Sequence, residues 1–212
     1  MLLLDIKDLK EKPLSAYVSP NLHRQHQQQY QFQLLMQQVL LKLPVEPILA
    51  AYPQLATWLS EVRSLLPSLF RVPANKLHLD IAYSHALNTT SYIQVSTNAV
   101  YKKQRIVLID WAIRKAKPTW GDKVKLWVVS ESLSIEPASL GLIILAVHRD
   151  RPANKLIIPW NLQEHNQTGR QVLKALKTSR QNSNQGVSSD AIGNANDNLL
   201  LPSIAEIDEV PI

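Results

Sequence analysis

The segment RIVLIDWAIRKAKPTW, residues 105–120, places a single aspartate, Asp110, inside an apolar run that basic residues follow. A carboxylate at the end of a buried strand costs free energy unless it has a partner or a function. Asp110 is therefore a candidate functional residue. The alternative is an aspartate that pairs with a nearby lysine or accepts a hydrogen bond from a backbone N–H.

The chain around Asp110 alternates apolar and polar residues in three consecutive segments, KLHLDIAYSHAL, SYIQVSTNAVY and QRIVLIDWAI. Turn-like NTT and KK separate them, which predicts an antiparallel three-stranded meander. Residues 122–133 then indicate a helix. The short apolar segment LGLIILAVHRD is typical of a buried strand. The next strand, KLIIPWN, lies at an edge or ends at Pro159, because proline cannot donate a hydrogen bond to a ladder.

Helical periodicity marks both ends of the same region. Residues 23–43 combine glutamines with apolar residues at helical spacing, and Pro44 follows. Residues 45–67 predict two short helices, with Pro47 and Pro53 near their starts, where a missing N–H is harmless. Residues 163–177 are the last predicted helix. The order of elements predicts an α/β or α+β fold in which helices flank a mixed central sheet.

Composition predicts one folded domain between two terminal segments. Of the 212 residues, 45% are hydrophobic, enough for a single sizeable core. We assign residues 1–21 to a lead segment without the features of a signal peptide, and residues 22–177 to the domain. Residues 178–212 are too polar to bury a core and are expected to be a disordered acidic tail. Its end, LLLPSIAEIDEVPI (residues 199–212), either docks on its own domain or binds a protein partner.

Two absences in the sequence narrow the expected environment. The chain has no cysteine, which excludes disulfides and thiolate metal sites and fits a reducing cytoplasm, so we expect a cytoplasmic location. No apolar run approaches the ~20 residues that a membrane span needs, so no membrane partner is expected.

Several short motifs occur in a fixed order along residues 22–177. They are FQLLMQQ (32–38), LPVEPILAAYPQLATWL (43–59), STNAVY (96–101), LIDWAI (108–113), DKVKLW (122–127) and HNQT (165–168). Together with the order of elements, they resemble the RecB-like branch of small bacterial proteins in the PD-(D/E)XK nuclease superfamily. The resemblance implies a restriction-endonuclease-like core and metal-dependent phosphodiester hydrolysis. In that chemistry two carboxylates hold the metal, and a lysine positions the water and stabilises developing negative charge.

The resemblance also assigns each position of that site in this chain. A histidine ligand of the early helix corresponds to Gln33, and the first carboxylate corresponds to Asn98. Asp110 is the retained second carboxylate, the lysine position holds Ala112, and a glutamine of the following helix corresponds to Lys123. These five positions are therefore expected to be vestigial, without an intact catalytic or metal site. No cofactor is expected, and Mg²⁺ or Mn²⁺ would be required only if the site were active.

Basic residues near Asp110 provide a second candidate site. Residues 1–177 contain 22 basic and 12 acidic residues, a surplus that favours an anionic partner. The candidate nucleic-acid-binding residues are Lys102, Lys103, Arg105, Arg114, Lys115, Lys117, Lys123 and Lys125. Trp120 and Trp127 either stack on bases or belong to the core. The same basic residues fit a solvated surface equally well.

Three functional hypotheses follow from the sequence. The main hypothesis is a catalytically inactive nuclease-like protein that binds DNA or RNA through a basic face. The first alternative is an adaptor that engages a protein partner through residues 199–212. The second is an active metal-dependent DNA nuclease whose lysine has moved to another position, such as Lys115 or Lys123.

Overall fold

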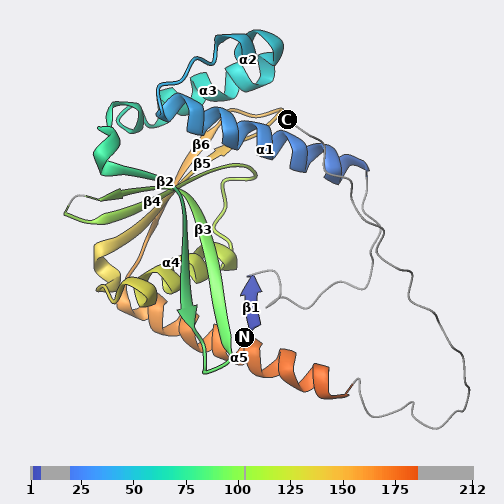
Figure 1. Ribbon diagram of the computed structural model, residues 1–212, viewed down its shortest axis with the longest axis vertical. Helices are drawn as coiled ribbons and strands as arrows, with labels where there is room; N and C mark the ends of the chain where they lie inside the picture. The colour runs from blue at the N-terminus through green and yellow to red at the C-terminus, as the bar shows by residue number, and fades with distance from the viewer. Residues whose placement is uncertain (1, 6–19, 103, 186–212) are drawn as a thin grey trace, which may run out of the picture.

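A computed structural model of the protein describes residues 2–5, 20–102 and 104–185 (Figure 1). Its strands are β1 (Leu2–Asp5), β2 (Leu77–Ala86), β3 (Ser91–Lys102), β4 (Ile106–Ile113), β5 (Leu140–Val147) and β6 (Asn154–Pro159). Its α-helices are α1 (Pro20–Leu40), α2 (Glu46–Ala51), α3 (Pro53–Leu65), α4 (Trp120–Leu133) and α5 (Leu162–Gln185). No helix in this part of the chain has both the length and the apolarity that a membrane span requires.

The described strands form one six-stranded mixed sheet. Strands β2, β3 and β4 are the predicted antiparallel meander, β4 and β5 are parallel, and β6 is antiparallel to β5. Helix α4 makes the crossover between the parallel strands, as such connections usually do. Strand β1 lies parallel to β3 and was not predicted from the sequence. The predicted fold class, a mixed sheet flanked by helices, is confirmed.

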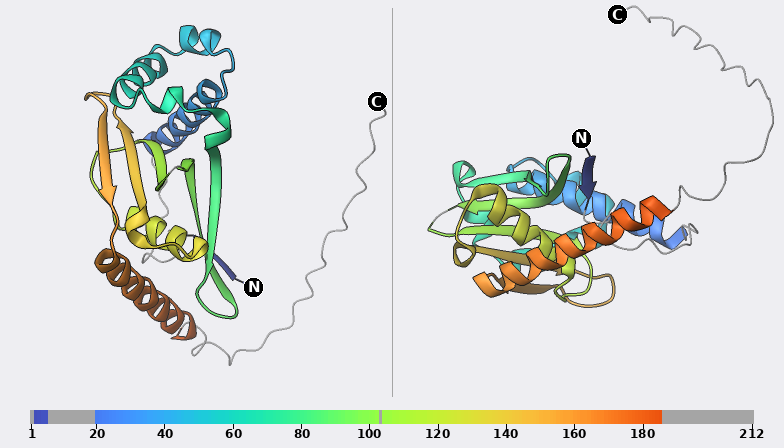
Figure 2. Two further views of the ribbon diagram at one scale, coloured as in Figure 1. Left: turned by 90° about the vertical axis from the view of Figure 1, so that its left-hand side faces the viewer. Right: turned by 90° about the horizontal axis from the view of Figure 1, so that it is seen from below.

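Helices cover both faces of the sheet (Figure 2). Alternate side chains of a strand point to opposite faces, so β4 contributes to two separate cores. Leu108 joins the core beneath α4 and α5, whereas Ile109 and Trp111 join the core beneath α1 and α3. The Trp58 side chain is buried in the core beneath α1 and α3 and donates a 2.9 Å hydrogen bond to the carbonyl of His148. The two cores fix α1 and α4 on opposite sides of β4.

The long strand β3 has an opening in one of its two ladders. Along one edge it pairs with β2 over almost its whole length. Along the other edge residues 91–94 pair with β1 and residues 99–102 pair with β4. Residues 95–98 have no strand partner on that edge, although β4 continues to Ile113 beside β5. Strands β3 and β4 therefore separate just before Asp110, and we call this opening the fork.

The terminal elements differ from the predicted boundaries, since α1 begins at Pro20, inside the predicted lead segment. Helix α5 extends to Gln185, beyond Lys177, where the sequence pattern predicted that the helix ends. Residues 178–185, which the sequence pattern placed in the tail, are thus helical. The remainder of the tail, residues 186–212, and residues 6–19 of the lead segment lie outside the described residues.

Candidate functional site

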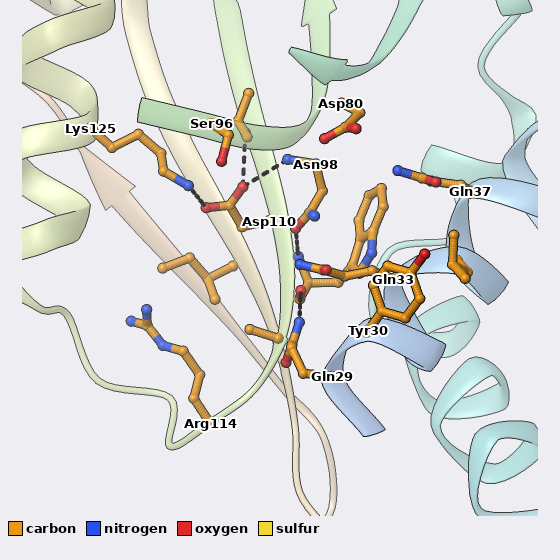
Figure 3. A pocket seen from close by; sticks show the side chains of 15 residues that line it. Gln29, Tyr30, Gln33, Gln37, Asp80, Ser96, Asn98, Asp110, Arg114 and Lys125 are labelled. Atoms are coloured by element: carbon orange, nitrogen blue, oxygen red, sulfur yellow. Dashed lines mark hydrogen bonds and ion pairs between the residues drawn. The ribbon is translucent and has the colours of Figure 1, made fainter. Parts of the chain in front are cut away.

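A cavity of about 460 Å³ lies at the fork (Figure 3). Helix α1 and strands β2, β3 and β4 surround it, and Lys125 enters it from α4. Its lining residues are Gln29, Tyr30, Gln33, Leu34, Gln37, Asp80, Ser96, Thr97, Asn98, Asp110, Trp111, Ala112, Arg114, Lys125 and Ile144. The lining includes four of the five positions that the family resemblance assigned: Gln33, Asn98, Asp110 and Ala112. These residues are far apart in the sequence, and the fold brings them together.

The Asp110 side chain occupies the fork and is hydrogen-bonded through both carboxylate oxygens. Its Oδ1 accepts from the hydroxyl of Thr97 at 2.8 Å and from the backbone N–H of Asn98 at 3.1 Å. Its Oδ2 accepts from Nζ of Lys125, with which it forms an ion pair. Both side chains are largely buried, 12% exposed for Asp110 and 15% for Lys125. Asp110 therefore has the lysine partner and the backbone N–H that the structural alternative required.

Two carboxamide side chains, those of Asn98 and Gln29, form hydrogen bonds with the backbone of β4 at the fork. Asn98 Oδ1 accepts from the backbone N–H of Trp111 at 2.9 Å. Gln29 Oε1 accepts from the backbone N–H of Ile113 at 2.6 Å, and its Nε2 donates to the carbonyl of Trp111 at 3.4 Å. The Gln29 amide thus pairs with β4 as a peptide group of a neighbouring strand would. Side chains thus satisfy the N–H groups of Asn98, Trp111 and Ile113 and the carbonyl of Trp111, which avoids about 1–3 kcal/mol for each group otherwise left unpaired.

The donor set at the fork does not fit a divalent cation. Such a cation requires several oxygens and normally more than one carboxylate. Asp110 is already neutralised by Lys125, and the carbonyl oxygen of Asn98 already accepts the Trp111 N–H. Within the described ranges, no group of three or more histidine, cysteine, aspartate or glutamate residues could hold a metal ion.

A second carboxylate, Asp80, also lines the cavity and was not singled out from the sequence. It lies on β2, between the paired residues Leu79 and Ile81, and its φ of 53° is left-handed. Aspartate tolerates this conformation better than most residues, and strain of this kind is common at functional sites. The clue in the sequence is an aspartate at the centre of a strand, where its β propensity is low.

The basic residues predicted to bind nucleic acid do not form one cluster. Lys102 and Arg105 lie at the β3–β4 hairpin, whereas Arg114, Lys115 and Lys117 follow the other end of β4. Because a strand rises about 3.3 Å per residue, the eight residues of β4 separate the two groups by roughly 26 Å. Lys103 lies outside the described residues.

Several of these basic residues also have partners within the protein. Arg105 donates to the carbonyl of Ala138 at 2.6 Å. Lys123 pairs with Glu164 of α5 at 2.7 Å, so it does not line the cavity, and Lys125 is the α4 lysine that does. Residues two positions apart on a helix point in nearly opposite directions, so only one of these lysines can face β4.

Arg114 is held at the start of α4 by a bidentate ion pair with Asp122, at 2.9 and 2.6 Å. Its Nη2 also donates to the carbonyl of Lys117 at 2.8 Å. Asp122 and Thr119 form a capping box, in which each side chain accepts from the backbone N–H of the other residue. Burial raises the pKa of Asp122, but the hydrogen bonds and charge of Arg114 and the hydrogen bonds of Thr119 outweigh it and lower that pKa.

The remaining candidate lysines are exposed. In the part of the chain that the structure describes, Lys102, Lys115 and Lys117 make no side-chain ion pair, and all three are solvent-exposed. Both tryptophans contribute to the core beneath α4 and α5. Trp127 is a core residue at 7% exposure, and Trp120 is half-buried and donates to Gln171 at 3.1 Å. Lys115 and Lys117 are thus the available cations beside the cavity.

Comparison with known proteins adds little at the level of function. No family model matches the chain, and no curated protein matches it. The chain is similar to the solved structure of SSO0001, with a TM-score of 0.37 and 16% identity over 66% of this chain and 61% of that chain. It is also similar to a "Putative exonuclease" from Eubacterium rectale, with a TM-score of 0.46 and 10% identity over 74% of this chain and 64% of that chain. This chain therefore spans less than two thirds of each of those chains, and neither likeness assigns it a function.

Replacing Asp110 by asparagine should destabilise the protein. The amide still accepts from Thr97 and Asn98, but the largely buried ammonium of Lys125 is left without its counter-charge, at a cost of about 1–3 kcal/mol. Urea unfolding of Asp110→Asn, Lys125→Met and the double variant measures this effect as a double-mutant cycle. We expect the double variant to be more stable than the sum of the single effects predicts. A single variant as stable as the wild type would contradict a structural role, because carboxylates kept only for function often cost stability.

Replacing Asp122 by asparagine should give a stability loss that depends on pH. Because the folded-state pKa lies below its ordinary value of 3.8, the carboxylate stabilises the fold above that pH and loses its contribution as pH falls through the lowered pKa. The variant should lose on the order of 2 kcal/mol at pH 7, from the ion pair and the cap together. Unfolding free energies measured between pH 7 and pH 2 should converge for the two proteins at the acidic end. A constant difference over that range would show that the charge of Asp122 contributes nothing.

Proposed function

We propose that this chain is a PD-(D/E)XK nuclease-like protein that binds nucleic acid without cutting it. The order of elements supports the relationship: a helix, an antiparallel meander, a crossover helix and two further strands match the arrangement that the sequence motifs imply. The convergence of Gln33, Asn98, Asp110 and Ala112 on one cavity supports it further, because the motifs assigned these four positions to a single site.

The engagement of Asp110 carries the proposal that hydrolysis is lost. A cation at Asp110 would have to compete with the Lys125 ammonium, which neutralises the carboxylate, and with the donors of Thr97 and the Asn98 N–H. A cation at this position would displace the Lys125 ammonium and open the fork. The carboxylate and lysine positions of the family hold Asn98 and Ala112, and each type of missing group typically contributes several kcal/mol to transition-state stabilisation.

The exposed lysines beside the cavity support nucleic-acid binding. Lys115 and Lys117 adjoin Arg114, a cavity-lining residue, on the segment that connects β4 to α4. Within the described residues, no carboxylate forms an ion pair with either lysine, so both can bind phosphates. Phosphate binding of this kind is salt-dependent and has little sequence preference. The binding surface that we propose is therefore the cavity end of β4, without the hairpin lysines.

One observation favours active hydrolysis as a second candidate function. Lys125 reaches Asp110 from α4, and Asp80 supplies a second carboxylate to the same cavity. A lysine that moved to another element is what the active alternative required, although Lys125 and not Lys115 or Lys123 is the residue concerned. We rank this function second because Lys125 is held in an ion pair with Asp110, the buried carboxylate of the cavity. It is therefore not free to position an attacking water. The adaptor hypothesis rests on residues 199–212, which lie outside the described residues, and stays a prediction.

Nuclease assays on the wild type beside the triple variant Gln33→His, Asn98→Asp, Ala112→Lys test the loss of hydrolysis. All three positions line the cavity, so the new side chains would restore a second carboxylate, an imidazole ligand and a lysine at the site. We expect no cleavage of DNA or RNA by the wild type in Mg²⁺ or Mn²⁺, and measurable cleavage by the variant. Wild-type cleavage that disappears in Asp110→Asn would contradict the proposal and favour the second candidate.

A salt titration of nucleic-acid binding tests the proposed surface. Removing two charges with Lys115→Gln and Lys117→Gln should weaken binding to a duplex. The slope of log affinity against log salt should fall by about 0.9 for each phosphate that the variant no longer neutralises. The matched control is Lys76→Gln with Lys102→Gln, which removes the same charge at the opposite end of the sheet, where Leu77 pairs with Tyr101. Equal effects of the two double variants would contradict a binding surface at the cavity end of β4.

A further inference from the structure

Several polar side chains of the cavity, among them Gln33, Gln37 and Ser96, have no hydrogen-bonding partner in the described part of the protein. Gln33 and Gln37 extend from α1 toward Asn98 and Asp80 (Figure 3), and Ser96 belongs to β3 on the opposite side. The neighbouring Gln29, one helical turn earlier, is bound to the backbone of β4. The Gln33 and Gln37 amides are half-buried, so they are partly withdrawn from solvent and remain available to a ligand.

The chemistry of these groups suits a neutral, planar ligand with polar edges. A carboxamide presents a donor and an acceptor side by side, as the edge of a nucleobase does, and the two pair through two hydrogen bonds. The cavity is a poor site for a phosphate, because its two cationic residues, Arg114 and Lys125, already form ion pairs with Asp122 and Asp110. Asp80 adds a negative charge that would repel a phosphate.

An aromatic and an aliphatic side chain border the same cavity. Tyr30 is 61% exposed and Leu34 is 39% exposed, and both lie on α1 close to Gln33 and Gln37. Exposed aromatic rings stack on bases, which gives about 1–3 kcal/mol per base in single-strand binding proteins. The cavity volume of about 460 Å³ lies within the range of small-molecule sites.

We propose that this cavity receives one unpaired nucleobase, held by the amides of Gln33 and Gln37 and stacked on Tyr30. This inference rests on the proposed function, since the lysines beside the cavity would hold the phosphates of the same strand. A base enters such a pocket from a single strand, or from a duplex at the cost of unstacking. The Asp80 carboxylate accepts hydrogen bonds only. An exocyclic amino group offers it two N–H donors and the N3–H of uracil or thymine only one, so the site favours adenine, cytosine and guanine.

Neutral nucleosides test the cavity without the phosphate surface. The wild-type protein is titrated with adenosine and with uridine to about 10 mM while the side-chain amide signals of Gln33 and Gln37 are followed by NMR. We expect adenosine to shift both signals and to bind at least about threefold more tightly than uridine. The absence of shifts with both nucleosides would overturn the inference, whatever the protein does with longer nucleic acids. Equal affinity for the two would overturn the stated base preference.

Single-stranded oligonucleotides then separate this inference from the proposed function. Gln33→Ala with Gln37→Ala should weaken binding of an oligonucleotide of adenines about tenfold and leave the salt slope unchanged. The matched control is Gln27→Ala, an exposed glutamine of the same helix outside the cavity lining. Oligonucleotide binding that disappears in Lys115→Gln with Lys117→Gln, but is unaffected by the glutamine changes, would support the proposed function and overturn the nucleobase site. If the protein binds adenosine but no oligonucleotide, the nucleobase site is supported and the proposed function is overturned.

Discussion

The opening between β3 and β4 is the constraint on which the rest of the site depends. Beyond the pair of Ala99 and Ile109, the two strands separate and leave backbone groups without a strand partner. A buried backbone group of this kind must find another hydrogen bond or destabilise the fold. Asp110, Asn98 and Gln29 provide those bonds with their side chains. The polar residues at the fork are therefore explained first by the needs of the backbone.

The same requirement limits what the site can do chemically. A cation at Asp110 would have to compete with the Lys125 ammonium and with the donors that join the two strands through this carboxylate. The walls of the cavity are held mainly by the two cores, which position α1 and α4 on either side of β4. A cavity of this kind does not depend on catalytic groups. That is the physical basis of the proposed binding without cutting.

Most of the fold could be predicted from the sequence, because it depends on local patterns. Strict alternation located the meander, and Pro44, Pro47 and Pro53 marked the helix boundaries. The site was predicted in part: the motif order placed Gln33, Asn98, Asp110 and Ala112 together. The sequence did not identify Lys125 as the partner of Asp110. Which lysine of α4 faces Asp110 depends on how the helix is rotated against the sheet.

Two further features required the three-dimensional structure. Asp80 lines the cavity and has a left-handed backbone conformation, which the neighbouring residues in the sequence do not predict. The basic residues are close in sequence but lie at both ends of β4, because an extended strand separates them.

The most direct test of the account is amide hydrogen exchange at Asn98, Trp111 and Ile113. If side chains close the fork, these three N–H groups exchange as slowly as those of the paired residues Ala99 and Ile109. Exchange at the rate of solvent-exposed amides would contradict the account, because the fork would then be open and Asp110 free to bind a cation.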